Sequence, residues 1–206
     1  YSKKIFKDTN TADIYFDINE GDITKIKNIF FEGNISVDNE ILKSIIKSKT
    51  KSLTNIFANN NYKKFAIIDD TRKIQNYYNN NGFKDAKIDF IIEYLESNKV
   101  NIYFKINEGK SYLINEVNLI DKNSLLNSQQ ISKSQDIISN YLNKNKIYSL
   151  DRINSISDEI SDLIISEGIE FFEIEISQNI NNEFVNFDLN ILAVEPKYSY
   201  QINIYG

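Results

Sequence analysis

The sequence predicts an α+β fold built from tandem repeats, each a strand–helix–helix–strand–strand unit with two helices on one face of a three-stranded sheet. The first observation is a repeated phrase: residues 13–21 read DIYFDINEG and residues 101–109 read NIYFKINEG, with seven of nine positions identical. A third, weaker copy runs from Val185 to Pro196. The second observation is that apolar residues alternate with period two in some segments and recur with helical period in others.

Strands are predicted wherever apolar and polar residues alternate. Residues 88–94 and the strand that begins at Val100 form one hairpin, with a turn at residues 96–99. Residues 172–176 lead through residues 178–182 into a second hairpin strand that begins at Val185. Residues 1–7 are the corresponding strand of a truncated first repeat. The alternation places five phenylalanines in the cores: Phe16, Phe31, Phe90, Phe104 and Phe187.

Two helices are predicted in the first full repeat. An apolar stripe at residues 41–46 indicates a short helix, with Ser36 or Asp38 as its N-cap. A second stripe over residues 67–78 indicates a longer helix, which Gly82 ends because glycine adopts the left-handed conformation.

The second full repeat has the same pair of predicted helices. They cover residues 131–142 and 153–164, and the second is capped by Ser149 and ended by Gly168. One asymmetry separates the repeats, because residues 50–65 form a much longer connection in the first repeat than its counterpart in the second. A connection of that length is either a functional loop or a disordered insert.

The repeated phrase also defines the expected domain boundaries. We expect the end of one repeat at residues 1–21, full repeats at 22–109 and 110–196, and the first strand of another repeat at 197–206. The chain is therefore expected to be an excerpt from a longer protein. About four residues separate each Asn-Glu-Gly glycine from the next strand, and such a short joint restricts relative motion to a hinge.

The composition argues against most site chemistry. The net charge is −5, and the acidic and basic residues are interleaved, so no basic patch indicates nucleic acid. The chain has no histidine and no cysteine, which excludes histidine- and cysteine-based triads and the usual zinc sites. No cofactor is expected. Asn-Glu-Gly lacks a phosphate-binding spacing and is interpreted as a turn that follows a strand.

An enzyme that acts through carboxylates is the competing class of function, and it needs two acidic side chains in one pocket. Asp69 and Asp70 are the best candidates, but they lie near the start of a predicted helix, where acids favourably meet the helix dipole. We therefore expect a protein that is not an enzyme. Tyr15 and Tyr103 lie opposite the core face of their strands, as half-exposed residues or as contacts with a neighbouring domain.

The repeats resemble POTRA domains, which form the periplasmic arm of Omp85-family outer-membrane proteins in Gram-negative bacteria. Three motifs carry the resemblance: Ile29-Phe-Phe-Glu-Gly-Asn34, Tyr77-Tyr-Asn-Asn-Asn-Gly-Phe83 and Phe104-Lys-Ile-Asn-Glu-Gly109. The resemblance covers the whole chain, and it is weaker in the second repeat, where Ile120-Asp-Lys122 replaces Glu-Gly-Asn. The number of repeats and the long connection at residues 50–65 favour third-like and fourth-like domains of an outer-membrane protein assembly factor.

This resemblance implies a periplasmic scaffold of the β-barrel assembly machinery. The partners that it implies are unfolded outer-membrane β-barrel precursors and accessory lipoproteins, and the full-length protein would carry a membrane β-barrel. An array from another Omp85-type translocase, such as a two-partner secretion, TamA-like or organelle import protein, is the alternative. The implied binding mode is the addition of an extended chain to an exposed sheet edge.

The resemblance also implies a site. In the third domain of the assembly factor, a propeller-shaped lipoprotein uses an edge strand that aligns with residues 87–95 here, which implies Asp89 and Leu95 as contact positions. A basic residue associated with that contact is replaced by Asp85. We expect Leu95→Pro to reduce capture without unfolding the domain, because proline lacks an N–H. The expected edge strand consists of Lys87, Ile88, Asp89, Phe90, Ile91, Ile92, Glu93, Tyr94 and Leu95.

Overall fold

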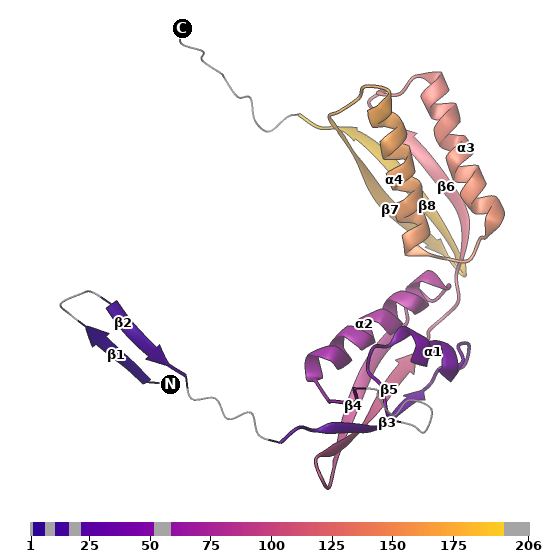
Figure 1. The fold of residues 1–206 in the computed structure, drawn as a ribbon. Coiled ribbons are helices and arrows are strands. Elements are labelled where there is room, and N and C mark those ends of the chain that lie inside the picture. Colours follow the sequence, from indigo (N-terminus) through magenta and orange to yellow (C-terminus); the bar gives the residue numbers. More distant parts are fainter. Residues whose placement is uncertain (1, 7–10, 17–21, 52–58, 196–206) are drawn as a thin grey trace.

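Two three-stranded sheets, each covered on one face by two helices, account for most of the chain (Figure 1). The computed structural model describes residues 2–6, 11–16, 22–51 and 59–195. The expected first strand of a following repeat, at residues 197–206, lies outside the described residues, as do Gly21 and Phe57. The α+β class and the predicted order of elements in both full repeats are confirmed.

The first full repeat forms a mixed sheet in which the last strand is central. Strand β5 pairs in parallel with β3 and antiparallel with β4, which gives the order β3-β5-β4. Both β3 and β4 are therefore edge strands, as expected for β4. The elements are β3 (Lys25–Glu32), α1 (Asn39–Ile45), α2 (Lys64–Asn80), β4 (Lys87–Leu95) and β5 (Lys99–Asn107).

The second full repeat has the same topology, with the order β6-β8-β7. The prediction that residues 178–182 form a loop was wrong, because β7 continues to Asn181 and pairs with β8 along its whole length. The turn is tight, and Asn182 has a φ of 57°. The elements are β6 (Leu113–Asp121), α3 (Ser128–Lys144), α4 (Leu150–Ser166), β7 (Phe172–Asn181) and β8 (Phe184–Ala193).

An N-terminal hairpin precedes the two repeats. Strands β1 (Ser2–Phe6) and β2 (Thr11–Tyr15) pair antiparallel, as the sequence predicts. The prediction that Phe16 lies in a core was wrong, because its side chain is 72% exposed. Alternation identifies which side chains share a face, but a face is buried only when another element packs on it. Neither hydrophobic core of the described chain includes this hairpin.

The cores form where the central strands meet the helices. In β5 the alternate residues Val100, Ile102 and Phe104 are fully buried, and Phe187 in β8 is 1% exposed. Phe31 and Phe90 lie on edge strands and are half-buried against the first core. Edge residues such as Phe31 and Phe90 lose cover on their outer side, whereas the alternating core-facing residues of the central strands are almost all fully buried.

A buried carboxylate accounts for the second copy of the Asn-Glu-Gly phrase, at residues 107–109. Glu108 is 8% exposed and accepts hydrogen bonds from the Ser36 N–H at 2.8 Å, the Ser36 hydroxyl at 2.7 Å and the Tyr78 hydroxyl at 2.9 Å. Burial and this carboxylate raise the pKa of Tyr78 above its usual range. Glu108 therefore joins the last strand to the turn after β3 and to α2, beyond the turn that we predicted from the phrase.

Gly33 lies in the turn after β3 that Glu108 holds. Its φ is +89°, and a Cβ at this position would lie 2.0 Å from the carbonyl oxygen of Ile106. Only glycine satisfies both constraints. Of the two predicted N-caps of α1, Asp38 occupies the cap position, although its side chain makes no capping hydrogen bond. Ser36 bonds Glu108 instead.

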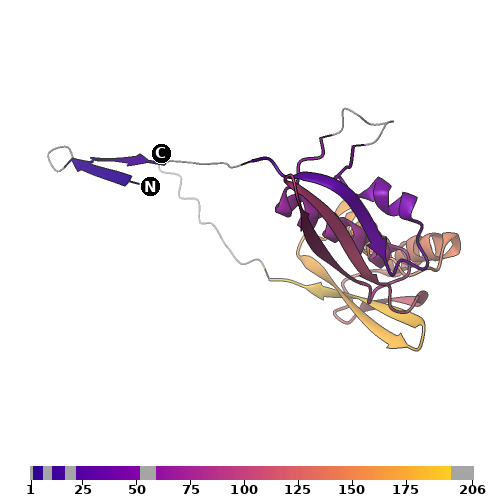
Figure 2. The ribbon, with the colours of Figure 1, turned by 90° about the horizontal axis from the view of Figure 1, so that it is seen from below.

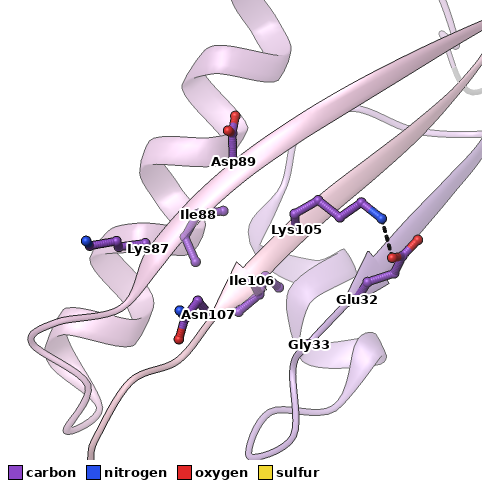
Figure 3. A pocket seen from close by; sticks show the side chains of 8 residues that line it. All are labelled: Glu32, Gly33, Lys87, Ile88, Asp89, Lys105, Ile106 and Asn107. Atoms are coloured by element: carbon purple, nitrogen blue, oxygen red, sulfur yellow. Dashed lines mark hydrogen bonds and ion pairs between the residues drawn. The ribbon is translucent and has the colours of Figure 1, made fainter.

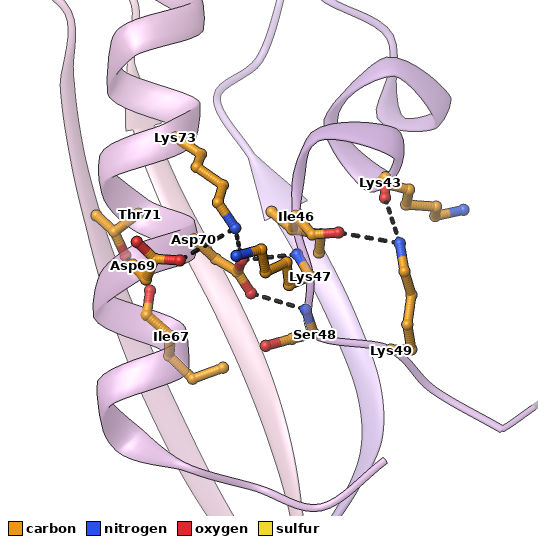
Figure 4. Close-up of polar contacts among 10 residues, drawn as sticks. All are labelled: Lys43, Ile46, Lys47, Ser48, Lys49, Ile67, Asp69, Asp70, Thr71 and Lys73. Atoms are coloured by element: carbon orange, nitrogen blue, oxygen red, sulfur yellow. Dashed lines mark hydrogen bonds and ion pairs between the residues drawn. The ribbon is translucent and has the colours of Figure 1, made fainter. Parts of the chain in front are cut away.

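Asp70 performs a similar structural role and is completely buried (Figure 4). Its two carboxylate oxygens accept the backbone N–H groups of Lys47 at 2.7 Å and Ser48 at 2.9 Å, and Lys73 pairs with it at 3.3 Å. The helix-dipole interpretation was wrong, since the first turn of α2 contains no acidic residue. Asp70 instead fixes the chain that leaves α1, while Asp69 pairs with Lys73 at 3.1 Å on the exposed side.

The joint between the two full repeats is hydrogen-bonded rather than a bare hinge. Gly82 donates its N–H to the Tyr148 carbonyl at 2.9 Å and accepts from the Tyr112 N–H at 2.8 Å. Asn80, the last residue of α2, accepts from the Asp151 N–H at 2.9 Å and from the Ser149 hydroxyl at 3.2 Å. The end of one repeat's helix thus caps the start of α4 in the next repeat.

Candidate functional site

The outer edge of β4 is the first part of the candidate site. Among the described residues, strand β4 pairs with β5 alone, so one side of its backbone has no strand partner in that part of the chain. Such an edge offers N–H and C=O groups to an incoming extended chain. The structure thus places all nine residues of the predicted site, Lys87–Leu95, on one edge strand.

The phase of the open backbone groups follows from one hydrogen bond. The N–H of Phe90 donates to the carboxylate of Asp89 at 2.8 Å and therefore points away from β5. Because backbone direction alternates along a strand, Ile88, Ile92 and Tyr94 also direct their N–H and C=O groups outwards. Asp89 covers the central donor of this edge, a device that protects edges from unwanted pairing.

Leu95 lies in the opposite phase. It is paired with Lys99 at the end of the β4–β5 hairpin, and alternation from Phe90 turns its N–H towards β5. Proline at Leu95 would therefore break the hairpin, which corrects the choice of probe made from the sequence. Tyr94 is the better position, because its N–H points outwards and its side chain is 71% exposed.

An apolar row crosses the open face of the same sheet, opposite the helices. Phe30, Tyr103 and Ile91 are neighbours on the three strands, and the rings of Phe30 and Tyr103 stack with centroids 4.9 Å apart. Phe30 is 40% exposed and Ile91 is 54% exposed. Tyr103 therefore contacts its own sheet, which decides between the two alternatives for this residue. Tyr15 on β2 is 57% exposed.

Polar groups hold Tyr103 in place beside this row. Glu93 accepts hydrogen bonds from the Asn101 amide and the Tyr103 hydroxyl, both at 2.8 Å. These bonds lower the pKa of Glu93, and the carboxylate raises the pKa of Tyr103. Edge, row and carboxylate together form a surface with both apolar contacts and hydrogen-bonding groups.

A hollow of about 540 Å³ flanks the start of β4 (Figure 3). Lys105 forms an ion pair with Glu32 across this end of the sheet, and Asp89 lies on the neighbouring strand. The lining therefore mixes both charges with the apolar side chain of Ile106. It is composed of Glu32, Gly33, Lys87, Ile88, Asp89, Lys105, Ile106 and Asn107.

The long connection between α1 and α2 reaches the opposite end of β4. Residues 59–62 run beside the start of β3, where Asn60 accepts from the Ile26 N–H at 2.7 Å and Tyr62 donates to Thr24 at 2.9 Å. Tyr62 then contacts Tyr94 edge-to-face, with ring centroids 6.4 Å apart. Burial, together with hydrogen bonding to Tyr94, raises the pKa of Tyr62 to about 12. Two separately predicted candidates, the edge and the connection, therefore meet.

Asp85, the position of the basic residue in the resembling family, is already engaged. Its carboxylate accepts from Lys84 and, at 2.6 Å, from the Tyr112 hydroxyl of the next repeat. These two hydrogen bonds, the one from Lys84 first, lower the pKa of Asp85. Asp85 therefore serves the joint between the repeats. Sequence reasoning identified the position but not this partner.

The described residues contain no group of three or more acidic side chains that would hold a metal ion. Within the same ranges, every helix is too short or too polar to cross a membrane. The features that gather on the first repeat are an open backbone edge, an aromatic row and a mixed-charge hollow.

Comparisons with known proteins agree with this architecture. Residues 24–109 match the model of the POTRA family, described as a surface antigen variable number repeat. A curated relative, the outer membrane protein assembly factor BamA of Neorickettsia risticii, is 27% identical over 119 residues; the match covers 56% of this chain and 16% of that protein.

Two solved structures share the fold. BamA POTRA3-5 of Haemophilus influenzae has a TM-score of 0.62 at 19% identity, covering 84% of this chain and 68% of that one. BamA of Haemophilus ducreyi lacking POTRA domains 1-3 has a TM-score of 0.55 at 15% identity, covering 83% and 29%. Residues 24–109 therefore match the POTRA family, and the second full repeat has the same topology. The curated relative and both solved structures to which the chain is similar are BamA proteins.

Proposed function

We propose that this POTRA array is a periplasmic scaffold of outer-membrane protein assembly, which binds unfolded β-barrel precursors and accessory lipoproteins by strand addition. The observation that carries the proposal is the outer edge of β4, whose central N–H donates to the side chain of Asp89 and to no strand of the described chain. An extended chain satisfies such an edge with its own backbone, whatever its sequence. That tolerance suits a scaffold with many clients.

The surface around the edge supplies selectivity. An added strand would place its side chains beside the exposed Ile91 on the open face and beside the half-buried Phe90 on the helix side. An outer-membrane strand alternates apolar and polar residues over about ten positions, which matches an edge of this length. A BamB-like propeller-shaped lipoprotein would use the same edge through an exposed loop.

Tyr94→Pro is expected to weaken the capture of an extended peptide by about tenfold, equivalent to ~1.4 kcal/mol. Proline removes one outward N–H and places a ring where the added strand would lie, while the bonds to β5 remain. The probe is a synthetic peptide of about ten residues that alternates threonine and valine between terminal lysines. Fluorescence anisotropy measures its binding, and circular dichroism confirms that the variant is folded.

Tyr94→Val is the matched control, because it removes the same aromatic ring and its contact with Tyr62 but keeps the N–H. We expect this variant to bind the peptide within about twofold of the unmodified chain. If Tyr94→Pro is folded and still binds normally, the β4 edge is not the binding site. Equal losses in both variants would assign the effect to the ring instead of the backbone.

Asp89→Ala is expected to strengthen capture of the same peptide by about two- to fivefold. The carboxylate of Asp89 competes with an incoming carbonyl for the Phe90 N–H, and alanine removes this competitor. Asp89→Asn is the control, since its side-chain oxygen can still accept the same bond. Unchanged or weaker binding by Asp89→Ala would show that the carboxylate does not protect this edge.

A further inference from the structure

The outer edge of β6, in the second repeat, is a second open edge of different character. Among the described strands β6 pairs with β8 alone, and α3 lies beside it (Figure 1). Between the edge and the helix is a hollow of about 410 Å³. Its lining combines apolar side chains from both elements with amide and hydroxyl groups at the rim: Val117, Asn118, Leu119, Gln135, Ile138 and Ser139.

The chain itself already adds an antiparallel segment to the beginning of this edge. Ile114 donates its N–H to the Lys146 carbonyl at 2.6 Å, and Tyr148 donates to the Tyr112 carbonyl at 3.0 Å. Leu113 and Ile147 form the corresponding antiparallel bridge. The first repeat repeats this arrangement at the start of β3, where Lys25 bridges Asn61. The beginning of the β6 edge therefore already pairs with an antiparallel segment of the same chain.

This internal pairing stops at a β-bulge. The register of β6 against β8 shifts between Ile114 and Glu116. Within residues 22–51 and 59–195, no backbone hydrogen bond reaches the outer side of β6 beyond Ile114. Ile114 faces the core and directs its N–H outwards. The bulge adds one residue to β6, so Val117 and Leu119 face the core again and also direct their N–H groups outwards. Their open groups border the hollow.

The charge of this sheet indicates which kind of peptide the edge would bind. Strands β6, β7 and β8 contain five acidic residues and no lysine or arginine. Four of the five lie on the face opposite the helices, among them Glu116 on β6 and Asp188 on β8. By contrast, all three strands of the first repeat's sheet contain lysine. The sheet of the second repeat thus attracts cationic side chains.

We infer that the outer edge of β6 binds an extended polypeptide that carries basic residues at alternate positions. The chain pairs antiparallel with residues 116–120 and continues the direction of the internal segment at residues 146–148. Its basic side chains lie on the acidic face beside Glu116, and the intervening small apolar side chains enter the hollow beside Ile138. The backbone supplies the affinity, and the acidic sheet supplies the preference for charge.

The test uses the 206-residue chain, labelled with ¹⁵N, and two blocked peptides. One peptide alternates lysine with valine and threonine, and the other has glutamate in place of every lysine. We expect the basic peptide to shift the amide resonances of Val117 and Leu119 and the acidic peptide to bind at least about tenfold more weakly. Binding of the basic peptide should weaken with salt, because exposed charges are screened.

Two variants locate the site. Ser139→Phe fills the hollow from α3 without altering the edge, and it should weaken the binding of the basic peptide by about tenfold or more. Ser132→Phe is the matched control, since Ser132 is exposed on the same helix but does not line the hollow. Equal binding by Ser139→Phe and the unmodified chain, or equal binding of both peptides, would overturn the inference.

Tyr94→Pro separates this inference from the proposed function. The basic peptide should keep its effects on β6 in that variant, because the β4 edge is in the other repeat. Resonance shifts confined to β4 would overturn the β6 site while leaving the proposed function standing. Shifts confined to β6 would support binding at the β6 edge, and binding at the β4 edge would then be judged from the Tyr94→Pro experiment alone.

Discussion

Phe104→Ala is expected to lower the free energy of unfolding by about 3–5 kcal/mol. The side chain of Phe104 is 0% exposed and stacks on Phe31 with ring centroids 5.5 Å apart. It lies on the central strand, between the fully buried Ile102 and the nearly buried Ile106. The surrounding strands cannot close the cavity, since their positions are fixed by hydrogen bonds. Urea denaturation measures the change.

Phe30→Ala is the control for this prediction. Phe30 lies on the open face of the same sheet and is 40% exposed, so its removal leaves a dent in the surface and no closed cavity. Phe30→Ala should lower the free energy of unfolding by about 1 kcal/mol. A loss below about 1 kcal/mol for Phe104→Ala, or one equal to that of Phe30→Ala, would contradict the assignment of the two faces.

Glu108→Ala is expected to cost about 2–5 kcal/mol, although it removes a charged residue that follows a strand end. The substitution leaves the hydroxyl of Tyr78 without its acceptor, and that side chain is completely buried. The Ser36 N–H and hydroxyl lose their acceptor at the same time. The orphaned hydroxyl of the buried Tyr78 costs about 1–3 kcal/mol, and the two groups of the exposed Ser36 add less because water can reach them.

Glu108→Gln and Glu96→Ala are the controls for the loss of stability in Glu108→Ala. Glutamine keeps one oxygen acceptor and should lose about half as much stability as alanine. Glu96 is exposed in the β4–β5 turn, so its replacement should change stability by less than about 0.5 kcal/mol. Thermal denaturation of the three variants provides the comparison. A Glu108→Ala loss no larger than that of Glu96→Ala would mean that the buried network is not stabilising.

Local periodicity was sufficient to predict the architecture. The alternation of Val100, Ile102 and Phe104 identified a strand with one buried face, and Gly82 marked the end of α2 correctly. The prediction of β4 as an edge followed from its single hairpin partner and the expected position of β3. These inferences succeed because side-chain direction in a strand depends only on the local backbone.

The polar contacts could not be predicted in the same way. Glu108 and Ser36 are 72 residues apart, and Asp70 and Ser48 are 22 apart, so only the folded chain brings them together. The repetition of Asn-Glu-Gly was a usable signal for Glu108, because a turn alone does not require a glutamate. Asn80 gave no such signal, since its partner is the first turn of a helix in another repeat.

The candidate site was predicted in position but not in detail. The sequence indicated which strand would be open, and the structure shows which of its backbone donors are open. Asp89 was predicted as a position of the family's lipoprotein contact, whereas in the structure its carboxylate covers the N–H of Phe90. The phase of the backbone also moved the proline probe from Leu95 to Tyr94, because a hairpin partner fixes that phase.

The shared helix cap makes the stability of one repeat depend on its neighbour. In stacked repeats, the total free energy is approximately a sum of intrinsic terms and nearest-neighbour terms. Here the nearest-neighbour term contains the cap from Asn80 to α4 and the backbone bonds of Gly82. Opening of the first repeat would therefore also destabilise the second. A force applied to the β4 or the β6 edge would therefore act on both domains, because hydrogen bonds and not a flexible linker connect them.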